Sequence, residues 1–223
     1  MFISIAGNIG LGKTTLAKII AKEWNFGFSP EKIGDDVNPF WKPFYEDIVN
    51  GVKPSKNAYD LQMRFLELRS EDHRKMQESS EWWVQDRSIY EDPLIYAVHL
   101  NTEGFLSDGD YERYLTAFEE VNESLEYPNL MIHLLTTPDV ARERIKMRAR
   151  PEEMHLVSLD NSYLDKLYEL YTDFSAKYHG KALLINPGKH NIKESEEERE
   201  CVLALIRKNT PGLNRKDIVV NGD

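Results

Sequence analysis

The sequence contains a single cysteine, Cys201, so an intramolecular disulfide is excluded. This cysteine usage is typical of a reducing compartment. No apolar run approaches the roughly 18 residues that a membrane span needs. The opening segment Met1–Ala6 also lacks the basic part of a secretory signal. We therefore expect a soluble, cytoplasmic protein without a membrane partner.

Basic residues are the minority, because 28 Lys and Arg stand against 38 Asp and Glu, which gives a net charge of −10. A broad surface for duplex nucleic acid needs clustered cations, and a field of this sign repels polyanions. We expect no nucleic-acid partner, and any site for a phosphorylated ligand must be local. The chain is nevertheless 41% hydrophobic over 223 residues, which is enough to build a folded core.

Short apolar segments alternate with stretches of helical periodicity along the chain. Strands are predicted at 2–6, 26–28, 82–84, 130–135 and 182–185. Helices are predicted from 16 to 23, after 39, from 61 to 78, and at 92–99, 111–125, 138–148, 163–178 and 195–208. Because the strands are too far apart for hairpins, this order predicts an α/β fold with a central, mainly parallel sheet covered by helices on both faces. With no Pro/Ser-rich linker in the sequence, we expect one domain over 1–213 and a mobile tail over 214–223.

The strongest motif lies between the first predicted strand and the first predicted helix. The pattern G-x-x-x-x-G-K-[ST] is matched by Gly7, Asn8, Ile9, Gly10, Leu11, Gly12, Lys13 and Thr14. In such a loop, backbone N–H groups and a helix N-terminus bind phosphates. We expect Lys13 to contact the β- and γ-phosphates and Thr14 to ligate Mg²⁺, and we add Thr15 to the phosphate-binding candidates. The motif predicts nucleotide binding but not the reaction.

An acid and an arginine, Asp86 and Arg87, follow the third predicted strand. The carboxyl ends of parallel strands border the ligand crevice, where the phosphate loop also lies. We expect Asp86 to hold Mg²⁺ or its water ligands and Arg87 to contact a phosphate or the acceptor oxygen. A structural salt bridge at the strand end is the alternative.

Five cations fall within residues 142–150, against the sign of the whole chain. Arg144 and Arg148 are four residues apart and share a helix face, and Arg150 follows at the break before a proline. Charge that develops on a transferred phosphoryl group needs such donors, and a mobile lid can bring them in. We therefore expect an Arg-rich lid at about 142–155. An exposed basic helix paired with neighbouring glutamates is the alternative.

Together these motifs resemble those of the deoxynucleoside kinase family, over roughly residues 1–186. The family pattern is a G-N-I-G-x-G-K-[ST] loop, a Glu after the second strand, N-P followed by F-Y, a Gln in a long helix, an acid-R-S strand end and an R-x-x-x-R-x-R-x-E-E lid. The matching positions here are Gly7 to Thr14, Glu31, Asn38-Pro39, Phe44-Tyr45, Gln62, Asp86-Arg87-Ser88, Arg144, Arg148, Arg150, Glu152 and Glu153. The resemblance implies a P-loop kinase fold and an enzyme that transfers the γ-phosphate of ATP, or of another nucleoside triphosphate, to the 5′-hydroxyl of a deoxynucleoside. It also implies Mg²⁺ as cofactor and a homodimer.

The resemblance further implies roles for individual residues. Glu31 would be the general base that accepts the proton of the 5′-hydroxyl, with Arg87 beside it. Tyr45 and Glu153 would hold the 3′-hydroxyl, and Gln62 would form a paired hydrogen bond with the base. The lid arginines would contact the donor phosphates, and Lys13 would stabilise the transition state.

Arg69 and Asp92 are the candidates for choosing the base. Gln62 and Arg69 are two helical turns apart and lie on nearly the same helix face, and Asp92 follows Asp86 closely enough to reach the same pocket. In deoxycytidine and deoxyadenosine kinases, a Gln and a paired Arg and Asp read the base, and thymidine-preferring relatives lack the pair. We therefore expect deoxyadenosine to be preferred, then deoxycytidine or deoxyguanosine, with thymidine poor. An ordinary surface salt bridge is the alternative.

The sequence departs from the family pattern in two places. The segment between Glu31 and Asn38 is about two residues longer than in the bacterial pattern, which leaves Asp35 or Asp36 as alternative bases. Ala149 stands where the lid usually has a glycine.

Two other functions are compatible with the phosphate loop. A deoxynucleoside monophosphate kinase shares the loop, the sheet and the lid, and its acceptor phosphate needs cations such as Lys42, Arg64 and Arg69. A P-loop regulatory switch is less favoured, because no base-specificity motif of GTPases is present and a switch does not need Gln62.

Overall fold

The computed structural model describes residues 1–149 and 162–213. Within these ranges, five strands form one parallel sheet in the order β2-β3-β1-β4-β5. The strands are β1 (Phe2–Gly7), β2 (Gly27–Ser29), β3 (Trp83–Asp86), β4 (Leu130–Leu134) and β5 (Ala182–Ile185). The predicted parallel sheet is therefore confirmed, and each predicted strand is present within two residues of its expected end.

The helices of the described residues are α1 (Lys13–Trp24), α2 (Trp41–Val49), α3 (Ala58–Glu78), α4 (Val98–Thr102), α5 (Asp108–Asn122), α6 (Pro138–Arg148), α8 (Ser162–Lys177) and α9 (Glu196–Asn209). Two of them begin at serine caps, where Ser107 accepts from the N–H of Asp110 at 3.2 Å and Ser195 accepts from the N–H of Glu198 at 3.3 Å. The helix predicted over 92–99 is present, but its first part, Asp92–Ala97, is π-helical and leads into α4. A π-helical turn holds an extra residue that apolar periodicity does not reveal.

The described residues group into two compact units. Unit 1 contains Met1–Pro30, Ser79–Arg87 and the described residues from Tyr127 onward, and unit 2 contains Glu31–Glu78 and Ser88–Glu126. The sheet belongs to unit 1, whereas α2 to α5 belong to unit 2. Because each unit is assembled from separated segments, no single linker divides them in the sequence, which is why the sequence alone predicts one domain.

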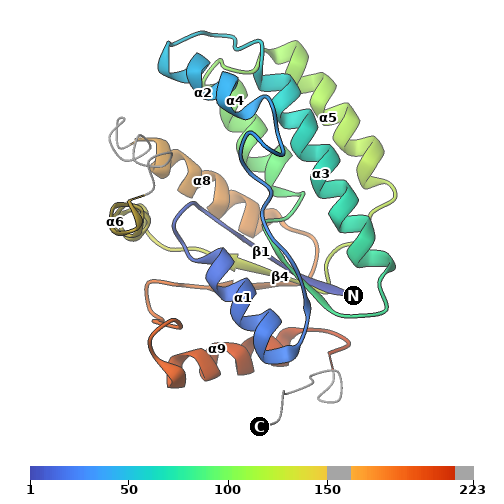
Figure 1. Cartoon of the computed structure of the whole chain (residues 1–223), viewed down its shortest axis with the longest axis vertical. Helices are drawn as coiled ribbons and strands as arrows, with labels where there is room; N and C mark the ends of the chain where they lie inside the picture. The colour runs from blue at the N-terminus through green and yellow to red at the C-terminus, as the bar shows by residue number, and fades with distance from the viewer. Residues whose placement is uncertain (150–161, 214–223) are drawn as a thin grey trace. The chain divides into compact units, whose positions relative to one another are not determined.

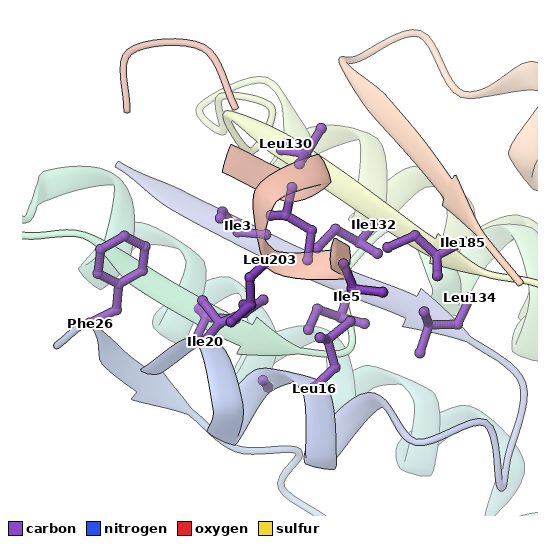
Figure 2. Packing of buried hydrophobic residues seen from close by; sticks show 14 of the residues in the cluster. Ile3, Ile5, Leu16, Ile20, Phe26, Leu130, Ile132, Leu134, Ile185 and Leu203 are labelled. Carbon is purple, nitrogen blue, oxygen red and sulfur yellow. The ribbon is translucent and has the colours of Figure 1, made fainter. Parts of the chain in front are cut away.

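The core of unit 1 lies between the sheet and the helices α1 and α9 (Figure 1). Side chains alternate along a strand, so Ile3 and Ile5 of β1 both point to this face. There they join Leu16 and Ile20 of α1 and Leu203 of α9, all at most 2% exposed (Figure 2). Burying one such side chain stabilises the fold by roughly 2 kcal/mol. This packing fixes the end of β1 and the start of α1, and thereby the loop that joins them.

The side chain of His133 points away from this core, and it contacts one ring of α8 and the ring of Tyr178, which directly follows α8. His133 of β4 is 2% exposed, and its ring centroid lies 4.9 Å from that of Phe174 and 5.5 Å from that of Tyr178. Its Nδ1 is 2.9 Å from the hydroxyl oxygen of Ser175. Burial lowers the pKa of His133 to about 4. The imidazole is therefore neutral at neutral pH.

We expect His133→Gln to reduce the loss of stability in mild acid. An unfolded chain protonates this histidine near its ordinary pKa of 6.5, whereas the folded chain keeps it neutral down to about pH 4. Because the folded pKa is depressed, this residue lowers the free energy of unfolding by roughly 2 kcal/mol between pH 7 and pH 5. The free energy of unfolding of the His133→Gln variant should therefore fall less between pH 7 and pH 5 than that of the parent protein. Urea unfolding at pH 7 and at pH 5 measures this difference. The pKa of His73 is also lowered by burial, but His73 is present in both proteins, so its contribution cancels in the comparison. An equal pH dependence in the two proteins would contradict the burial account.

Unit 2 is built around α3 and α5, which run side by side (Figure 1). The π-helical segment packs against both helices. On their sequence pattern, Tyr114, Phe118 and Leu125 could form either core or a dimer interface. Tyr114 is fully buried in unit 2, while Phe118 and Leu125 are half-buried, so Tyr114 belongs to the core. In the described ranges, no helix combines the length and the apolar character needed to cross a membrane.

Candidate active site

The phosphate loop joins β1 to α1 within unit 1. Gly10 and Gly12 have φ values of 83° and 90°, in the left-handed region that favours glycine. A Cβ on Gly10 would also lie 3.0 Å from the carbonyl oxygen of Ala141, so a larger residue there would require the loop or α6 to shift by a few tenths of an ångström. Residues of left-handed conformation are what an anion-binding nest of N–H groups requires. The strand–loop–helix context that the motif demands is therefore present.

Lys13 is the first residue of α1 and only 6% exposed, although it carries a charge. Its Nζ donates to the carbonyl oxygen of Asn8 at 3.2 Å, so the ammonium group lies across the loop. Asn8 in turn donates from Nδ2 to the carbonyl oxygen of Leu164 at 3.2 Å, which ties the loop to α8. The ammonium group and the positive end of the α1 dipole thus reinforce each other at the loop.

Thr14 and Asp86 meet at the start of α1. The hydroxyl of Thr14 donates to Oδ2 of Asp86 at 2.5 Å. Asp86 ends β3 and pairs in register with Ile5 of β1, which brings its carboxylate to the loop that follows β1. Hydroxyl and carboxylate oxygens are ligands that Mg²⁺ prefers. The described residues contain no group of three or more His, Cys, Asp or Glu able to hold a metal ion, so phosphate oxygens and water would have to complete the coordination of Mg²⁺ here.

Arg87 follows β3 in a left-handed conformation with φ 74°. Its N–H donates to the carbonyl oxygen of Ile5 at 3.0 Å, and its Nη1 donates to the hydroxyl of Tyr171 at 2.9 Å. A non-glycine residue in this region costs roughly 1–2 kcal/mol, and such residues cluster at functional sites. The sequence did not single out Tyr171. Its only signal is its place on the apolar face of α8, which predicts core packing and not a contact with arginine.

The basic segment lies partly on α6. Arg144 donates to the carbonyl oxygens of Leu11 at 3.1 Å and Pro187 at 2.7 Å, so its guanidinium contacts the backbone of the phosphate loop. Burial lowers the pKa of Arg144, but from so high a value that the group stays charged. Arg148 is exposed at the end of the helix. The structure therefore brings Arg144 to the loop and leaves Arg148 on the surface.

Ala149 ends α6 with φ 50°, and its N–H donates to the carbonyl oxygen of Ile145 at 2.9 Å. Glycine is the usual residue at such a left-handed helix end, which explains the glycine of the family pattern at this position. Some predicted features lie outside the described residues, namely Arg150, Glu152, Glu153, the remainder of the predicted lid to 155 and the predicted tail 214–223.

In unit 2, the segment after β2 places Glu31 against α3. Oε1 of Glu31 lies 3.9 Å from Nη2 of Arg69. The next residue, Lys32, forms an ion pair with Asp72 of α3, with Nζ and Oδ1 2.7 Å apart. These two contacts hold Glu31 half-buried beside one face of the helix.

The alternative acids of the same segment are placed differently. Asp35 and Asp36 are both exposed. Oδ1 of Asp35 accepts from the N–H of Lys42 at 3.0 Å, so Asp35 satisfies a backbone donor near the start of α2. Asn38 is fully buried and donates to the carbonyl oxygen of Leu61 at 3.2 Å, which anchors the end of the segment to α3. Within the described part of the chain, Glu31 is the only one of these three acids with a contact to a buried cation, Arg69.

Arg69 of α3 and Asp92 of the π-helical segment form a buried ion pair. The exposed fractions of the two residues are 9% and 1%, so the alternative of an ordinary surface salt bridge is wrong. Gln62, two turns earlier on α3, is 3% exposed, and its Oε1 has no hydrogen-bond partner among the described residues. A buried amide oxygen without a donor costs roughly 1–3 kcal/mol, which a bound ligand can recover by donating to it.

Tyr45 lies on α2 and is half-buried. Its ring packs against those of Trp41 and Phe44, with centroids 4.8 and 5.8 Å away. This packing fixes the orientation of the phenol ring. Unit 2 thus holds the predicted acceptor residues Glu31, Tyr45, Gln62, Arg69 and Asp92, and unit 1 holds the predicted donor residues of the phosphate loop with Asp86, Arg87 and Arg144.

Residues 3–210 match the family model described as deoxynucleoside kinase. The deoxyadenosine kinase of Dictyostelium discoideum is 38% identical over 172 residues, which span 77% of this chain and 65% of that protein. The deoxyadenosine/deoxycytidine kinase of Bacillus subtilis (strain 168) is 30% identical over 184 residues, which span 82% of this chain and 80% of that protein. A solved deoxyadenosine kinase from M. mycoides has the same fold, with a TM-score of 0.74 at 22% identity over 93% of this chain and 100% of that chain. The chain therefore belongs to the deoxynucleoside kinase family, and it transfers a phosphate from a nucleoside triphosphate to a deoxynucleoside.

Proposed function

We propose that this deoxynucleoside kinase prefers deoxyadenosine, then deoxycytidine or deoxyguanosine, and uses thymidine poorly. The observation that carries this preference is the buried Arg69–Asp92 pair. The carboxylate accepts from an exocyclic amino group, and the guanidinium donates to a ring nitrogen. Thymine presents a carbonyl oxygen where adenine and cytosine present the amino group. A thymine oxygen facing Asp92 would place two acceptors against each other, which disfavours its binding.

The relatives support this preference. The Dictyostelium discoideum protein is named a deoxyadenosine kinase, and the Bacillus subtilis protein a deoxyadenosine/deoxycytidine kinase. The M. mycoides deoxyadenosine kinase has been solved with bound dATP and with bound dCTP. We propose ATP as the donor of this chain, with Mg²⁺ as its cofactor.

On the donor side, we propose that Lys13 and the N–H groups of the loop hold the β- and γ-phosphates. Thr14 and Asp86 would ligate Mg²⁺, which when bound neutralises part of the phosphate charge. Arg144 already lies against the loop and adds a second cation there. Arg87, held by Tyr171, supplies a fixed donor to the transferred phosphoryl group.

On the acceptor side, we propose that Glu31 accepts the proton of the 5′-hydroxyl as the oxygen attacks the γ-phosphorus and the bond to the leaving nucleoside diphosphate breaks. The positive charge of Arg69 stabilises the carboxylate form that this step needs. Gln62 would form hydrogen bonds with the base edge, and Tyr45 would donate to the 3′-hydroxyl. Glu153, the other candidate for the 3′-hydroxyl, lies outside the described residues.

Two of the three acceptor-side cations already pair with other groups, which favours a nucleoside over a nucleoside monophosphate as the acceptor. A second phosphate would need cations that are not already neutralised. Arg64 pairs with Glu67 at 2.5 Å and donates to the carbonyl oxygen of Val37 at 3.2 Å. Arg69 pairs with Asp92. Of the three predicted candidates, Lys42 alone lies exposed.

Steady-state kcat/KM values for the four deoxynucleosides, with ATP and Mg²⁺, test the proposed preference. We expect deoxyadenosine to rank first and deoxyadenosine monophosphate to be a poor acceptor. Arg69→Met should lower the ratio of kcat/KM for deoxyadenosine to kcat/KM for thymidine by about 100-fold, because only amino-bearing bases use the pair. A loss common to all four deoxynucleosides would report the contact of Arg69 with Glu31. Arg74→Met, on the same helix, is the matched control. Thymidine ranking first would refute the proposed base recognition and leave the family assignment intact.

A further inference from the structure

Tyr114 of α5 has a buried hydroxyl that none of the proposed roles uses. The residue is 0% exposed, and its hydroxyl oxygen has no hydrogen-bond partner among the residues that the structure describes. A buried hydroxyl in this state destabilises a fold, and phenylalanine would fill the same space without it. A polar atom that weakens the core is expected where a ligand or a functional group uses it.

The surroundings of Tyr114 indicate which group that is. Helix α5 packs against α3, which carries Arg69, and against the π-helical segment, which begins at Asp92. Burial raises the pKa of Tyr114 well above its usual range, the charge of Asp92 raises it further, and the charge of Arg69 lowers it. Both members of the ion pair therefore act on the hydroxyl. The hydroxyl therefore stays protonated and is available as a hydrogen-bond donor, on a helix packed against both elements that carry the pair.

Binding of a base changes which groups donate hydrogen bonds to Asp92. In this structure Arg69 donates to Oδ1 of Asp92. A base whose ring nitrogen accepts from Arg69 draws the guanidinium toward itself and weakens its hold on the carboxylate. The exocyclic amino group of the base supplies one donor to the carboxylate, and a further donor that offsets the weakened contact with Arg69 favours the bound state.

We propose that Tyr114 is a positioning residue for base recognition, whose hydroxyl donates to Asp92 when Arg69 turns toward a bound amino-bearing base. The inference rests on the proposed role of the Arg69–Asp92 pair. The hydroxyl has no partner among the described residues before binding and gains one on binding, so the same atom disfavours the empty state and favours the loaded one. Thymine does not engage the pair and gains nothing from Tyr114. The residue therefore adds to the selectivity between bases.

Tyr114→Phe tests the inference, because it removes one oxygen atom and keeps the ring. We expect kcat/KM for deoxyadenosine and deoxycytidine to fall about tenfold, the loss of one hydrogen bond to a charged group, mainly through a higher KM. The value for thymidine should stay within about twofold, on the same reasoning. The thermal unfolding midpoint should be unchanged or higher, because the unsatisfied hydroxyl is gone.

Tyr111→Phe is the matched control, since it removes a hydroxyl from a half-buried tyrosine of the same helix, and it should leave the ranking of the bases unchanged. Unchanged discrimination in Tyr114→Phe would overturn the inference. So would an equal loss for all four deoxynucleosides with a lower unfolding midpoint, which is the signature of a purely structural role. If Arg69→Met also leaves the discrimination unchanged, the proposed function fails. If Arg69→Met abolishes the discrimination and Tyr114→Phe does not, only the role of Tyr114 is wrong.

Discussion

Lys13→Ala is expected to lower kcat by about three orders of magnitude while the protein stays folded. The ammonium group lies across the phosphate loop at the N-terminus of α1, with Nζ 3.2 Å from the carbonyl oxygen of Asn8. From there it offsets the charge that builds up on the phosphate oxygens during transfer, and loss of one such donor typically costs 10²–10³-fold or more. Steady-state phosphorylation of deoxyadenosine measures the effect.

Two companion variants separate charge from packing. Lys13→Met keeps most of the buried aliphatic stem, so it should be as inactive as the alanine variant but more stable to heat. Lys18→Ala removes a lysine from the exposed face of the same helix and should retain turnover. Turnover near the wild-type value in Lys13→Met would argue against a phosphate-binding role for the loop.

Glu31→Gln is expected to lower kcat by about 10²–10⁴-fold with little change in KM. Glutamine keeps the size and the hydrogen-bonding capacity of the side chain but does not accept a proton. The ion pair of Lys32 with Asp72 holds this segment against α3 and is untouched by the substitution, and the amide oxygen of glutamine can still accept from Arg69, so we expect the side chain to keep its position. Rapid-quench measurement of the phosphorylation step, apart from product release, is the sharpest readout.

Asp36→Asn is the matched control for Glu31→Gln, since it makes the same chemical change on an exposed acid of the same segment. It should retain nearly full activity. An inactive Asp36→Asn together with an active Glu31→Gln would mean that the longer segment shifts the base, and that the correspondence of Glu31 with the family's glutamate is wrong.

The order of elements was predictable because each strand of the sheet is a compact apolar segment and most helices show clear periodicity. β4 and β5, at Leu130–Leu134 and Ala182–Ile185, needed no information beyond their composition and spacing. The π-helical segment and the division into two units were not predictable. The division depends on contacts between segments far apart in the sequence, such as the ion pair from α3 to Asp92. The extra residue of a π-helical turn is not visible in apolar periodicity.

The candidate site was predictable as a set of residue types but not as a set of contacts. Spacing placed Gln62 and Arg69 on one helix face, and both are buried there. Nothing in the spacing indicated that Arg144 contacts the backbone of the phosphate loop, or that the hydroxyl of Tyr114 is buried without a partner among the described residues. Such details depend on side-chain packing between helices, which periodicity does not report.

At Arg87, selection on backbone conformation and selection for turnover favour different amino acids. Its backbone conformation, with φ 74°, is one that glycine adopts without strain, so engineering guided by backbone conformation alone would place glycine at this position. Glycine would remove the guanidinium that Tyr171 holds, and with it a proposed contact to the transferred phosphoryl group. Consensus or heat-guided engineering of this enzyme is therefore better directed at surface positions away from the end of β3, where the two kinds of selection agree.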